Sequence, residues 1–486
     1  MQLRNGSFAV RLIPPELLVV RNTKLPFSEN NSAMWAGRGT STRTLTGFRV
    51  EAPYLRVTFA PQIIASDNAY WELRGRDFYA PEIPPGYEGR GFAFPFNFYT
   101  FPIDVPLRMG GERIRNFDLG ESSVMITAGF AQFGWSNENQ WWGPGIRNAM
   151  ILSNNAPGFS HLFARTGRPL KTPAGDLEMR WLVGTLTESR YFDTVSTNNF
   201  RSIASLALSL QTRWDPNLVV GVARSVYATA RNRRQARTRW LYVFNHASKP
   251  NSGILDDLWN ADSVDIPAGR DELLSLFARW VFPASGAEVY AEWGRTSLPH
   301  SPSDFLIAPN HTQGYTLGMQ WRGAAPGGGD LRLQAEMTQL EQSATWRDRP
   351  VGSWYTSTRV LQGYTNKGQV IGAATGPGGS SQFAALDYVR TAWQVGAFIG
   401  RSRVNEDVHG TYGFPVYVAY CSHDVIVYPG LRGNVRGSFG TLSGEFSLQN
   451  RLVAFFQNAG GCPNTGLRRD IRNKSFRLTW SPAGGR

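Results

Sequence analysis

The feature that most constrains this fold is a period-two alternation of apolar and polar residues in many short segments. Residues 330–338 (DLRLQAEMT) and 475–480 (SFRLTW) place apolar side chains on one face and charged or hydroxyl side chains on the other. Residues 202–214 and 287–293 follow the same pattern. This period is typical of half-buried β-strands, and no long segment shows the spacing of an amphipathic helix.

The connections between these segments are of two kinds that alternate along the chain. Short, turn-like joints lie at 214–217, 283–287, 323–330, 387–392 and 439–444. Long irregular connections lie near 67–108, 134–160, 229–270, 343–381, 405–430 and 458–473. Short turns at one end and long loops at the other are typical of outer-membrane barrels, with periplasmic turns and extracellular loops. A soluble β-sandwich has no reason to sort its loops in this way.

The pattern predicts an all-β fold, a transmembrane outer-membrane antiparallel β-barrel of about 18 strands, as one domain over residues 1–486. Its apolar faces would contact lipid and its polar faces would line the lumen. The expected strands are 8–22, 44–52, 55–66, 110–119, 122–134, 160–167, 175–187, 200–213, 217–228, 271–283, 287–297, 312–323, 329–342, 382–390, 393–404, 431–440, 443–457 and 473–480.

The N-terminal residues do not resemble an export signal. Pro14 and Pro15 stand where the apolar core of a signal peptide would be. Since the rest of the chain has the pattern of an exported protein, we expect the signal peptide and any N-terminal periplasmic segment to be absent from this sequence. The mean hydropathy of −0.30 is compatible with a barrel, because its strands average polar and apolar faces.

The composition favours a polyanionic partner and gives no sign of catalysis. The 50 Lys and Arg outnumber the 37 Asp and Glu, for a net charge of +13. This charge suits an acidic polysaccharide or anionic lipid headgroups. No nucleic-acid motif is present, so we expect no nucleic-acid partner. The 6 histidines have no metal-ligand spacing and no GxSxG motif occurs, so we expect no metal, no cofactor and no enzyme.

Several motifs resemble the capsule-assembly Wzi family. The most specific is QWWGPG (140–145), which is followed by an arginine and a loop ending in APGFSH. Similar segments follow in order: SAMWAGRG (32–39), GTLTESRYFD (184–193), LIAPNHTQGYTLGMQW (306–321) and YTNKGQVIGAATGPGGSSQ (364–382). The resemblance covers most of the chain. It implies an eighteen-stranded outer-membrane barrel that acts as a lectin for capsular polysaccharide.

The QWWGPG loop carries the first candidate binding site. Trp141 and Trp142 would either plug the lumen or stack on the apolar faces of sugar rings, and the plug is the favoured interpretation. Such a plug could still present polar side chains to hydroxyls and carboxylates. The candidates for that role are Arg147, Asn148, Asn154 and Asn155.

The second candidate site is the densest basic segment, in the long loop after the eighth strand. Guanidinium groups form paired hydrogen bonds with carboxylate or phosphate, so this segment would grip lipopolysaccharide phosphates or an acidic polymer. Its residues are Arg231, Arg233, Arg234, Arg237, Arg239 and Trp240. Other aromatic clusters in the predicted loops, among them Tyr70–Trp71 and Trp35 with Arg38, are interpreted as loop packing.

The two cysteines, Cys421 and Cys462, fall on neighbouring predicted outer loops, so we expect a disulfide between them. The sequence predicts a monomeric lectin-like protein that anchors an acidic surface polysaccharide. A channel for oligosaccharides or other anionic solutes remains the alternative, since it would share the fold, the basic character and the aromatic loops.

Overall fold

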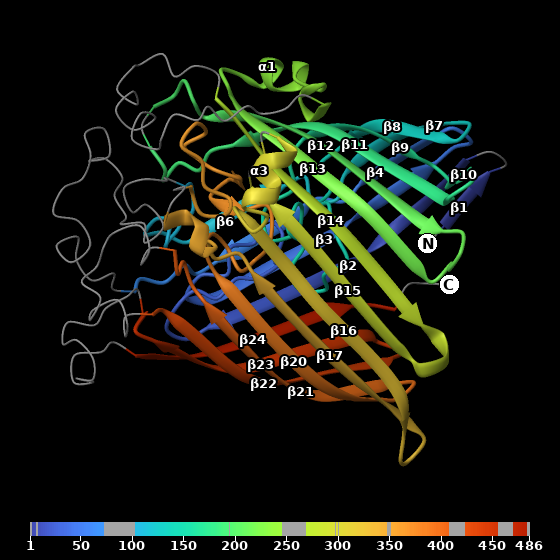
Figure 1. Ribbon diagram of the computed structural model, residues 1–486. Helices are drawn as coiled ribbons and strands as arrows, with labels where there is room; N and C mark the ends of the chain where they lie inside the picture. Colours follow the sequence, from blue (N-terminus) through green and yellow to red (C-terminus); the bar gives the residue numbers. More distant parts are fainter. Residues whose placement is uncertain are drawn as a thin grey trace.

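The computed structural model describes residues 2–5, 8–71, 103–193, 195–244, 269–296, 298–299, 301–347, 351–407, 423–454 and 470–483. These residues form a closed antiparallel β-barrel (Figure 1). The strands of its wall are β2 (Phe8–Asn22), β3 (Gly39–Glu51), β4 (Leu55–Phe59), β5 (Gln62–Ser66), β6 (Ile114–Asp118), β7 (Ser123–Ala128), β8 (Ala131–Ser136), β9 (His161–Thr166), β10 (Leu170–Thr172), β11 (Gly175–Thr187), β12 (Phe200–Thr212), β13 (Leu218–Ala230), β14 (Arg270–Phe282), β15 (Ala287–Arg295), β16 (Gln313–Ala325), β17 (Gly329–Gln339), β20 (Ser380–Val389), β21 (Trp393–Arg403), β22 (Val425–Gly437), β23 (Gly440–Leu452) and β24 (Ile471–Ser481).

The remaining elements are short. β1 (Gln2–Asn5) pairs with β2, and β18 (Thr365–Asn366) pairs with β19 (Gln369–Val370) inside a loop. The helical elements are α1 (Arg233–Thr238), η2 (Tyr242–Phe244), η3 (Pro283–Ser285), α3 (Pro302–Ile307) and η4 (Ala344–Arg347). None of the helices in the described ranges is both long and apolar enough to span a membrane.

The wall has the predicted number of strands. β4 and β5 both pair with β3 on one side, and with β7 and β6 on the other. β4 and β5 are therefore one interrupted strand, and β6 and β7 are a second. β9 and β10, which both pair with β11, are a third. Counted in this way, the 21 wall segments of the described chain make eighteen strands. β24 pairs with β2, with Leu17 opposite Trp480, which closes the barrel. The prediction of an eighteen-stranded barrel is confirmed.

Several predicted boundaries were wrong, among them the following three. Residues 122–134 are not one strand, because the chain turns at Gly129–Phe130, between β7 and β8, and β7 instead continues the line of β6. The turn predicted at 439–444 is tighter, since β23 already begins at Gly440. The loop predicted to end at 430 ends earlier, because β22 begins at Val425.

The double proline does not break the first wall strand. The register between β2 and β3 shifts between Ile13 and Glu16, so Pro14 and Pro15 lie in a bulge where the ladder needs no backbone donor from them. The predicted strand 8–22 is therefore confirmed.

The two faces of the wall differ as the alternation predicts. On β17, Gln334 and Glu336 are buried, whereas Leu333 and Met337 are only half-buried. On β24, Ser475 is buried and Phe476 is exposed. Large apolar side chains cover the outside of the wall, among them Leu12, Phe48, Ile63, Leu276, Leu317, Leu386, Ile399, Leu431, Leu448 and Phe476. This outer face has the character of a surface that contacts lipid.

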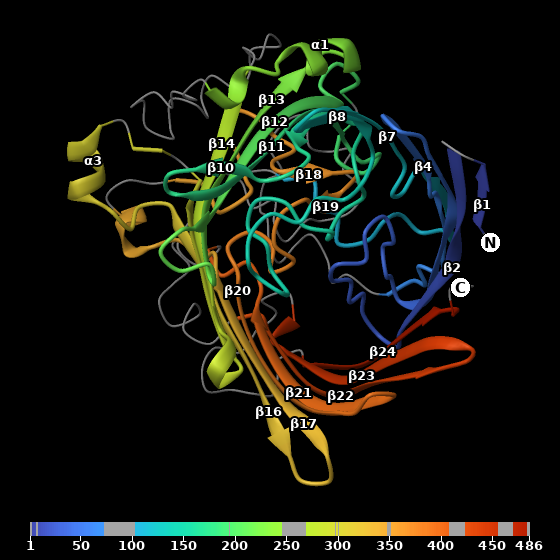
Figure 2. The same cartoon turned by 90° about the vertical axis from the view of Figure 1, so that its right-hand side faces the viewer.

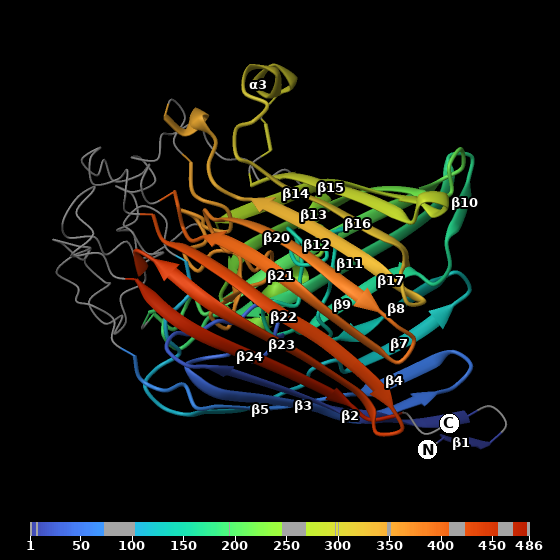
Figure 3. The ribbon, with the colours of Figure 1, turned by 90° about the horizontal axis from the view of Figure 1, so that it is seen from below.

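The long and short connections lie at opposite ends of the barrel. The short turns and both termini are at the right of Figure 1, and the same arrangement appears from below in Figure 3. Exposed aromatic residues mark the short-turn end, among them Trp214, Trp280, Trp393 and Phe439. Aromatic girdles of this kind are typical of the membrane–water boundary. The end with the long connections is called the loop end below.

Candidate functional site

Residues 137–160, called the tryptophan loop below, fold into the lumen (Figure 2). Trp142 is buried, and its backbone N–H donates to Leu152 O at 3.0 Å, which ties the two limbs of the loop together. Met150 and Ile151 are fully buried. The loop forms one core with the inner wall, with Leu340 and with residues 354–373. The other members of this core include Leu182, Ile203, Tyr227, Leu273, Trp354, Tyr355 and Tyr364. This arrangement supports the plug interpretation of Trp142.

The Gly-Pro-Gly sequence allows this loop to pack closely. Gly143 has φ of +126°, and a Cβ there would lie 2.6 Å from Glu292 Oε2. A Cβ on Gly145 would lie 2.0 Å from Asn148 O. Trp141 is half-buried, and its indole N–H donates to Gly145 O at 2.9 Å across the turn. The glycines are therefore required by the close approach of a wall carboxylate and of the loop itself.

Two carboxylates of the inner wall hold the loop by its backbone. Glu336 on β17 accepts hydrogen bonds from the backbone N–H groups of Ile146 (2.6 Å), Arg147 (3.1 Å) and Asn148 (2.9 Å). It also accepts one from the Tyr290 hydroxyl at 2.8 Å. Glu292 on β15 accepts one from Met150 N at 3.3 Å. These hydrogen bonds go to backbone groups, so they fix the path of the loop at residues 146–150 independently of the side chains there.

The four polar residues predicted to face a ligand make internal contacts. Arg147 Nη2 lies 3.0 Å from Glu29 Oε2, and its guanidinium lies 4.1 Å from the centre of the Phe383 ring. Asn148 Nδ2 donates to Ser381 Oγ at 3.2 Å. The backbone carbonyl of Asn154 accepts from Ser32 N at 2.7 Å. Three of the four thus tie loops to one another or to the wall, and the fourth, Asn155, also borders a cavity.

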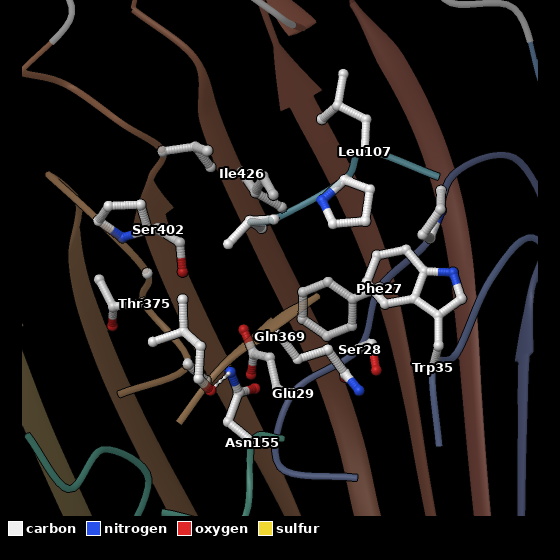
Figure 4. A pocket seen from close by; sticks show the side chains of 18 of the residues that line it. Phe27, Ser28, Glu29, Trp35, Leu107, Asn155, Gln369, Thr375, Ser402 and Ile426 are labelled. Atoms are coloured by element: carbon white, nitrogen blue, oxygen red, sulfur yellow. Dashed lines mark hydrogen bonds between the residues drawn. The ribbon is translucent and has the colours of Figure 1, made fainter. Parts of the chain in front are cut away.

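That cavity has a volume of about 200 Å³ and lies at the loop end of the barrel (Figure 4). Its walls come from the connection between β2 and β3, from the glycine-rich residues 368–377 and from the loop-side ends of β21, β22 and β23. Its lining residues include Phe27, Glu29, Trp35, Trp71, Leu107, Asn155, Gln369, Thr375, Ser402, Ile426 and Arg451.

The cavity combines aromatic and hydrogen-bonding side chains. Figure 4 shows Phe27 and Trp35 on one side, and Thr375 and Ser402 on the other. Asn155 donates through Nδ2 to Val370 O at 3.0 Å, which joins the tryptophan loop to the glycine-rich segment. Aromatic faces suit the C–H faces of sugars, and amides and hydroxyls suit their hydroxyl groups.

The charged groups that border the cavity are paired. Glu29 faces Arg147, and Arg451 binds Asp424 through two hydrogen bonds of 2.8 and 2.5 Å. Burial raises the pKa of the Glu29 carboxyl above its ordinary value, and the Arg147 guanidinium opposes this shift. The cavity is therefore mainly a neutral surface of rings, amides and hydroxyls.

Sequence reasoning singled out Trp35 and Trp71 but interpreted both as loop packing. Trp71 is buried, in agreement with packing, and both tryptophans also line the cavity. Phe27, Gln369 and Ser402 were missed. They lie on three segments that are far apart in sequence, and no local motif connects those segments. The available signal was Trp35, the one aromatic residue in 32–39, which lies close to glycine and arginine.

The basic segment lies apart from the cavity and outside the barrel wall. Arg231, Arg233, Arg234 and Arg237 are exposed around α1, whereas Arg239 is buried and donates to Ser202 Oγ on β12 at 3.5 Å. Trp240 is exposed at 46% but packs against Trp181 of β11, with 5.3 Å between ring centres. The structure thus separates the two predicted groups of ligand-binding residues. Cys421 and Cys462 lie outside the described residues, so their disulfide stays a prediction.

The comparisons with known proteins agree with the barrel. The family model of the capsule assembly protein Wzi matches residues 46–391. The solved structure of Escherichia coli Wzi, described as a carbohydrate binding β-barrel involved in group 1 capsule assembly, shares 12% identity and has a TM-score of 0.58. The alignment covers 96% of this chain and 84% of that one.

Two further solved structures are more distant. Pseudomonas aeruginosa OccD3 has a TM-score of 0.41 at 8% identity, over 97% of this chain and 91% of that one. Pseudomonas aeruginosa OccK2 in complex with glucuronate has a TM-score of 0.40 at 8% identity, over 96% and 97%. No curated protein matches the chain in sequence.

Proposed function

Because this chain belongs to the capsule assembly protein Wzi family, we propose that it binds and anchors an acidic surface polysaccharide at the bacterial outer membrane. The long loops would face the cell exterior, and the chain would act as a binding protein without cleaving its ligand. The Escherichia coli member of the family is described as carbohydrate binding, which supports the class of ligand. The net charge of +13 supports a polymer that carries carboxylates.

The observation that carries this proposal is the cavity at the loop end. It offers Phe27 and Trp35 for stacking and Asn155, Gln369 and Ser402 for hydrogen bonds. Pockets that bind small ligands typically combine apolar walls with a few polar groups in this way. One short stretch of the polymer would occupy the cavity, and the rest would lie across the loops.

The test is binding of the surface polysaccharide of the source bacterium to the purified protein in detergent. Trp35→Ala removes a ring from the cavity and should weaken binding at least tenfold. Trp214→Ala is the matched control, because Trp214 is 71% exposed at the opposite, short-turn end. The two variants should have similar melting temperatures. If both variants bind the polysaccharide as tightly as the unmodified protein does, the ligand lies outside the cavity or the protein does not bind polysaccharide.

The predicted alternative is a channel for oligosaccharides or other anionic solutes. A channel needs a continuous aqueous path, and the buried core around Trp142 and Tyr355 occupies part of the lumen. We therefore expect no steady conductance when the protein is inserted into planar bilayers. A stable open pore would favour the channel. After incubation with the protein, the polysaccharide should keep its chain length, and shortening would indicate a hydrolase.

A further inference from the structure

The segment 231–244, called the arginine flap below, is folded over the outer face of the barrel wall. Leu182 and Leu186 of β11 belong to the core inside the lumen, so Trp181 points outward. Trp240 and Phe244 of the flap pack against this Trp181, with ring-centre distances of 5.3 and 6.1 Å. In the view along the barrel, α1 lies outside the ring of strands (Figure 2).

The flap covers charged groups that face outward from the wall. Ala223 and Leu273 belong to the core inside the lumen, so the adjacent residues Arg224 of β13 and Glu272 of β14 point outward. They form an ion pair with each other. Arg224 also donates to Val243 O in the flap at 2.8 Å. Because charges that face hydrocarbon are costly, this pair indicates that the wall under the flap lies at the edge of the apolar layer.

The free surface of the flap is both basic and apolar. Arg231, Arg233, Arg234 and Arg237 are exposed, and the sequence 231–244 contains no Asp or Glu. Beside them, Trp240, Leu241 and Phe244 are 46%, 47% and 58% exposed. Arginines next to exposed apolar side chains are typical of segments that lie in the headgroup region of a membrane.

A second element lies outside the same end of the barrel. Glu292 points into the lumen, so its neighbour Trp293 points outward, and Phe305 of α3 packs edge-on against Trp293. Leu306 and Ile307 of α3 are 77% and 82% exposed. Figure 3 shows α3 projecting away from the wall. Two separate elements thus place exposed apolar residues outside the loop end, which is expected where the wall leaves the bilayer.

We propose that the arginine flap binds the phosphate groups of phosphorylated glycolipids in the leaflet at the loop end. The guanidinium groups would form paired hydrogen bonds with phosphate oxygens, which suit this geometry better than lysine ammonium groups do. Trp240, Leu241 and Phe244 would lie between the acyl chains. The flap fits a lipid better than a polysaccharide because it lies beside the wall and carries apolar residues. This surface is independent of the cavity proposed for polysaccharide.

The test measures binding of bisphosphorylated lipid A to the full chain in detergent by native mass spectrometry. Changing Arg231, Arg233, Arg234 and Arg237 together to Gln should lower the affinity at least tenfold and flatten its dependence on salt. Asn232, which caps α1 through Gln235 N, and the buried Ala236 are unchanged, so the flap should stay folded. Lipid A without phosphates should bind the unmodified protein as weakly as bisphosphorylated lipid A binds the variant.

The matched control changes four exposed arginines at the short-turn end to Gln, namely Arg168, Arg213, Arg390 and Arg436. This control variant has the same net charge as the flap variant and should bind lipid A with unchanged affinity. If both variants lose the same affinity for lipid A, the net charge of the protein explains the binding, and the proposal is overturned. So would a flap variant that keeps its affinity for lipid A but loses surface polysaccharide, because the flap would then be a polysaccharide site.

Discussion

Arg147 in the tryptophan loop lies 3.0 Å from the carboxylate of Glu29, which borders the cavity. The ion pair thus connects the plug of the lumen to the wall of the candidate binding site. Both side chains are 22% exposed, so each is largely removed from water. Losing one partner would leave the other charge half-buried and without its counter-charge.

Arg147→Met should therefore destabilise the protein by about 1.5–3 kcal/mol, the usual range for a hydrogen bond between charged groups. The double variant Glu29→Gln, Arg147→Met should be more stable than Arg147→Met alone, because no unpaired carboxylate remains. Thermal unfolding in detergent measures both. Additive losses in the double variant would show that the two residues do not interact.

Glu336 should be the main anchor of the tryptophan loop, because it accepts three backbone hydrogen bonds from residues 146–148. Glu336→Gln replaces one acceptor oxygen by an NH₂ group, which would face backbone donors. We expect a lower melting temperature and intermittent conductance in planar bilayers as the loop loosens. The control is Glu288→Gln, since Glu288 pairs with Arg279 near the surface. Equal behaviour of the two variants would mean that Glu336 does not hold the plug.

Gly143→Ala should test why the loop contains Gly-Pro-Gly. The new Cβ would lie 2.6 Å from Glu292 Oε2 at a φ of +126°, so we expect a loss of about 1–3 kcal/mol from backbone strain. In Gly111→Ala the new Cβ would meet no atom within 4 Å, so its stability should hardly change. A Gly143→Ala variant as stable as the Gly111→Ala control would show that the loop can shift freely.

Asp407, at the loop end, should make the folding stability of the protein depend on pH. Burial raises the pKa of its carboxyl from 3.8 to about 7, although the Gln342 backbone N–H donates to it. Because the folded pKa is the higher one, the protonated form is favoured in the folded state, and its stabilising contribution is lost as pH rises through about 7. Asp407→Asn should remove this pH-dependent contribution to the folding stability. The check is the melting temperature from pH 4 to 8, and parallel curves for the two proteins would contradict the assignment.

The barrel could be predicted from sequence because its wall obeys a strictly local rule. Alternation assigns Gln334 inward and Leu333 outward without knowledge of any other strand. The rule failed at 122–134, where Gly129 and Phe130 make a two-residue turn between two apolar runs that read as one strand. The rule held at Pro14 and Pro15. These prolines lack a backbone N–H donor, but they lie in a bulge where the strand ladder needs none from them.

The candidate site was less accessible to this reasoning. The polar residues of the tryptophan loop were expected to face a ligand, but the sequence of a loop does not show into which space the loop folds. Arg147 and Asn148 contact Glu29 and Ser381, which are more than a hundred residues away in sequence. The cavity likewise collects Phe27, Gln369 and Ser402 from distant segments. Such contacts depend on the closed barrel and leave no local pattern.

The pairing of β2 with β24 sets an order for biogenesis. Asn22 lies opposite Ser475, so the final seam joins residues from the two ends of the chain. A barrel whose seam contains its last strand cannot close during synthesis, and contacts so remote in sequence form slowly. The tryptophan loop, whose carboxylate anchors lie on β15 and β17, can dock as soon as both strands have paired with β16 between them. The ring would then close around a preassembled interior.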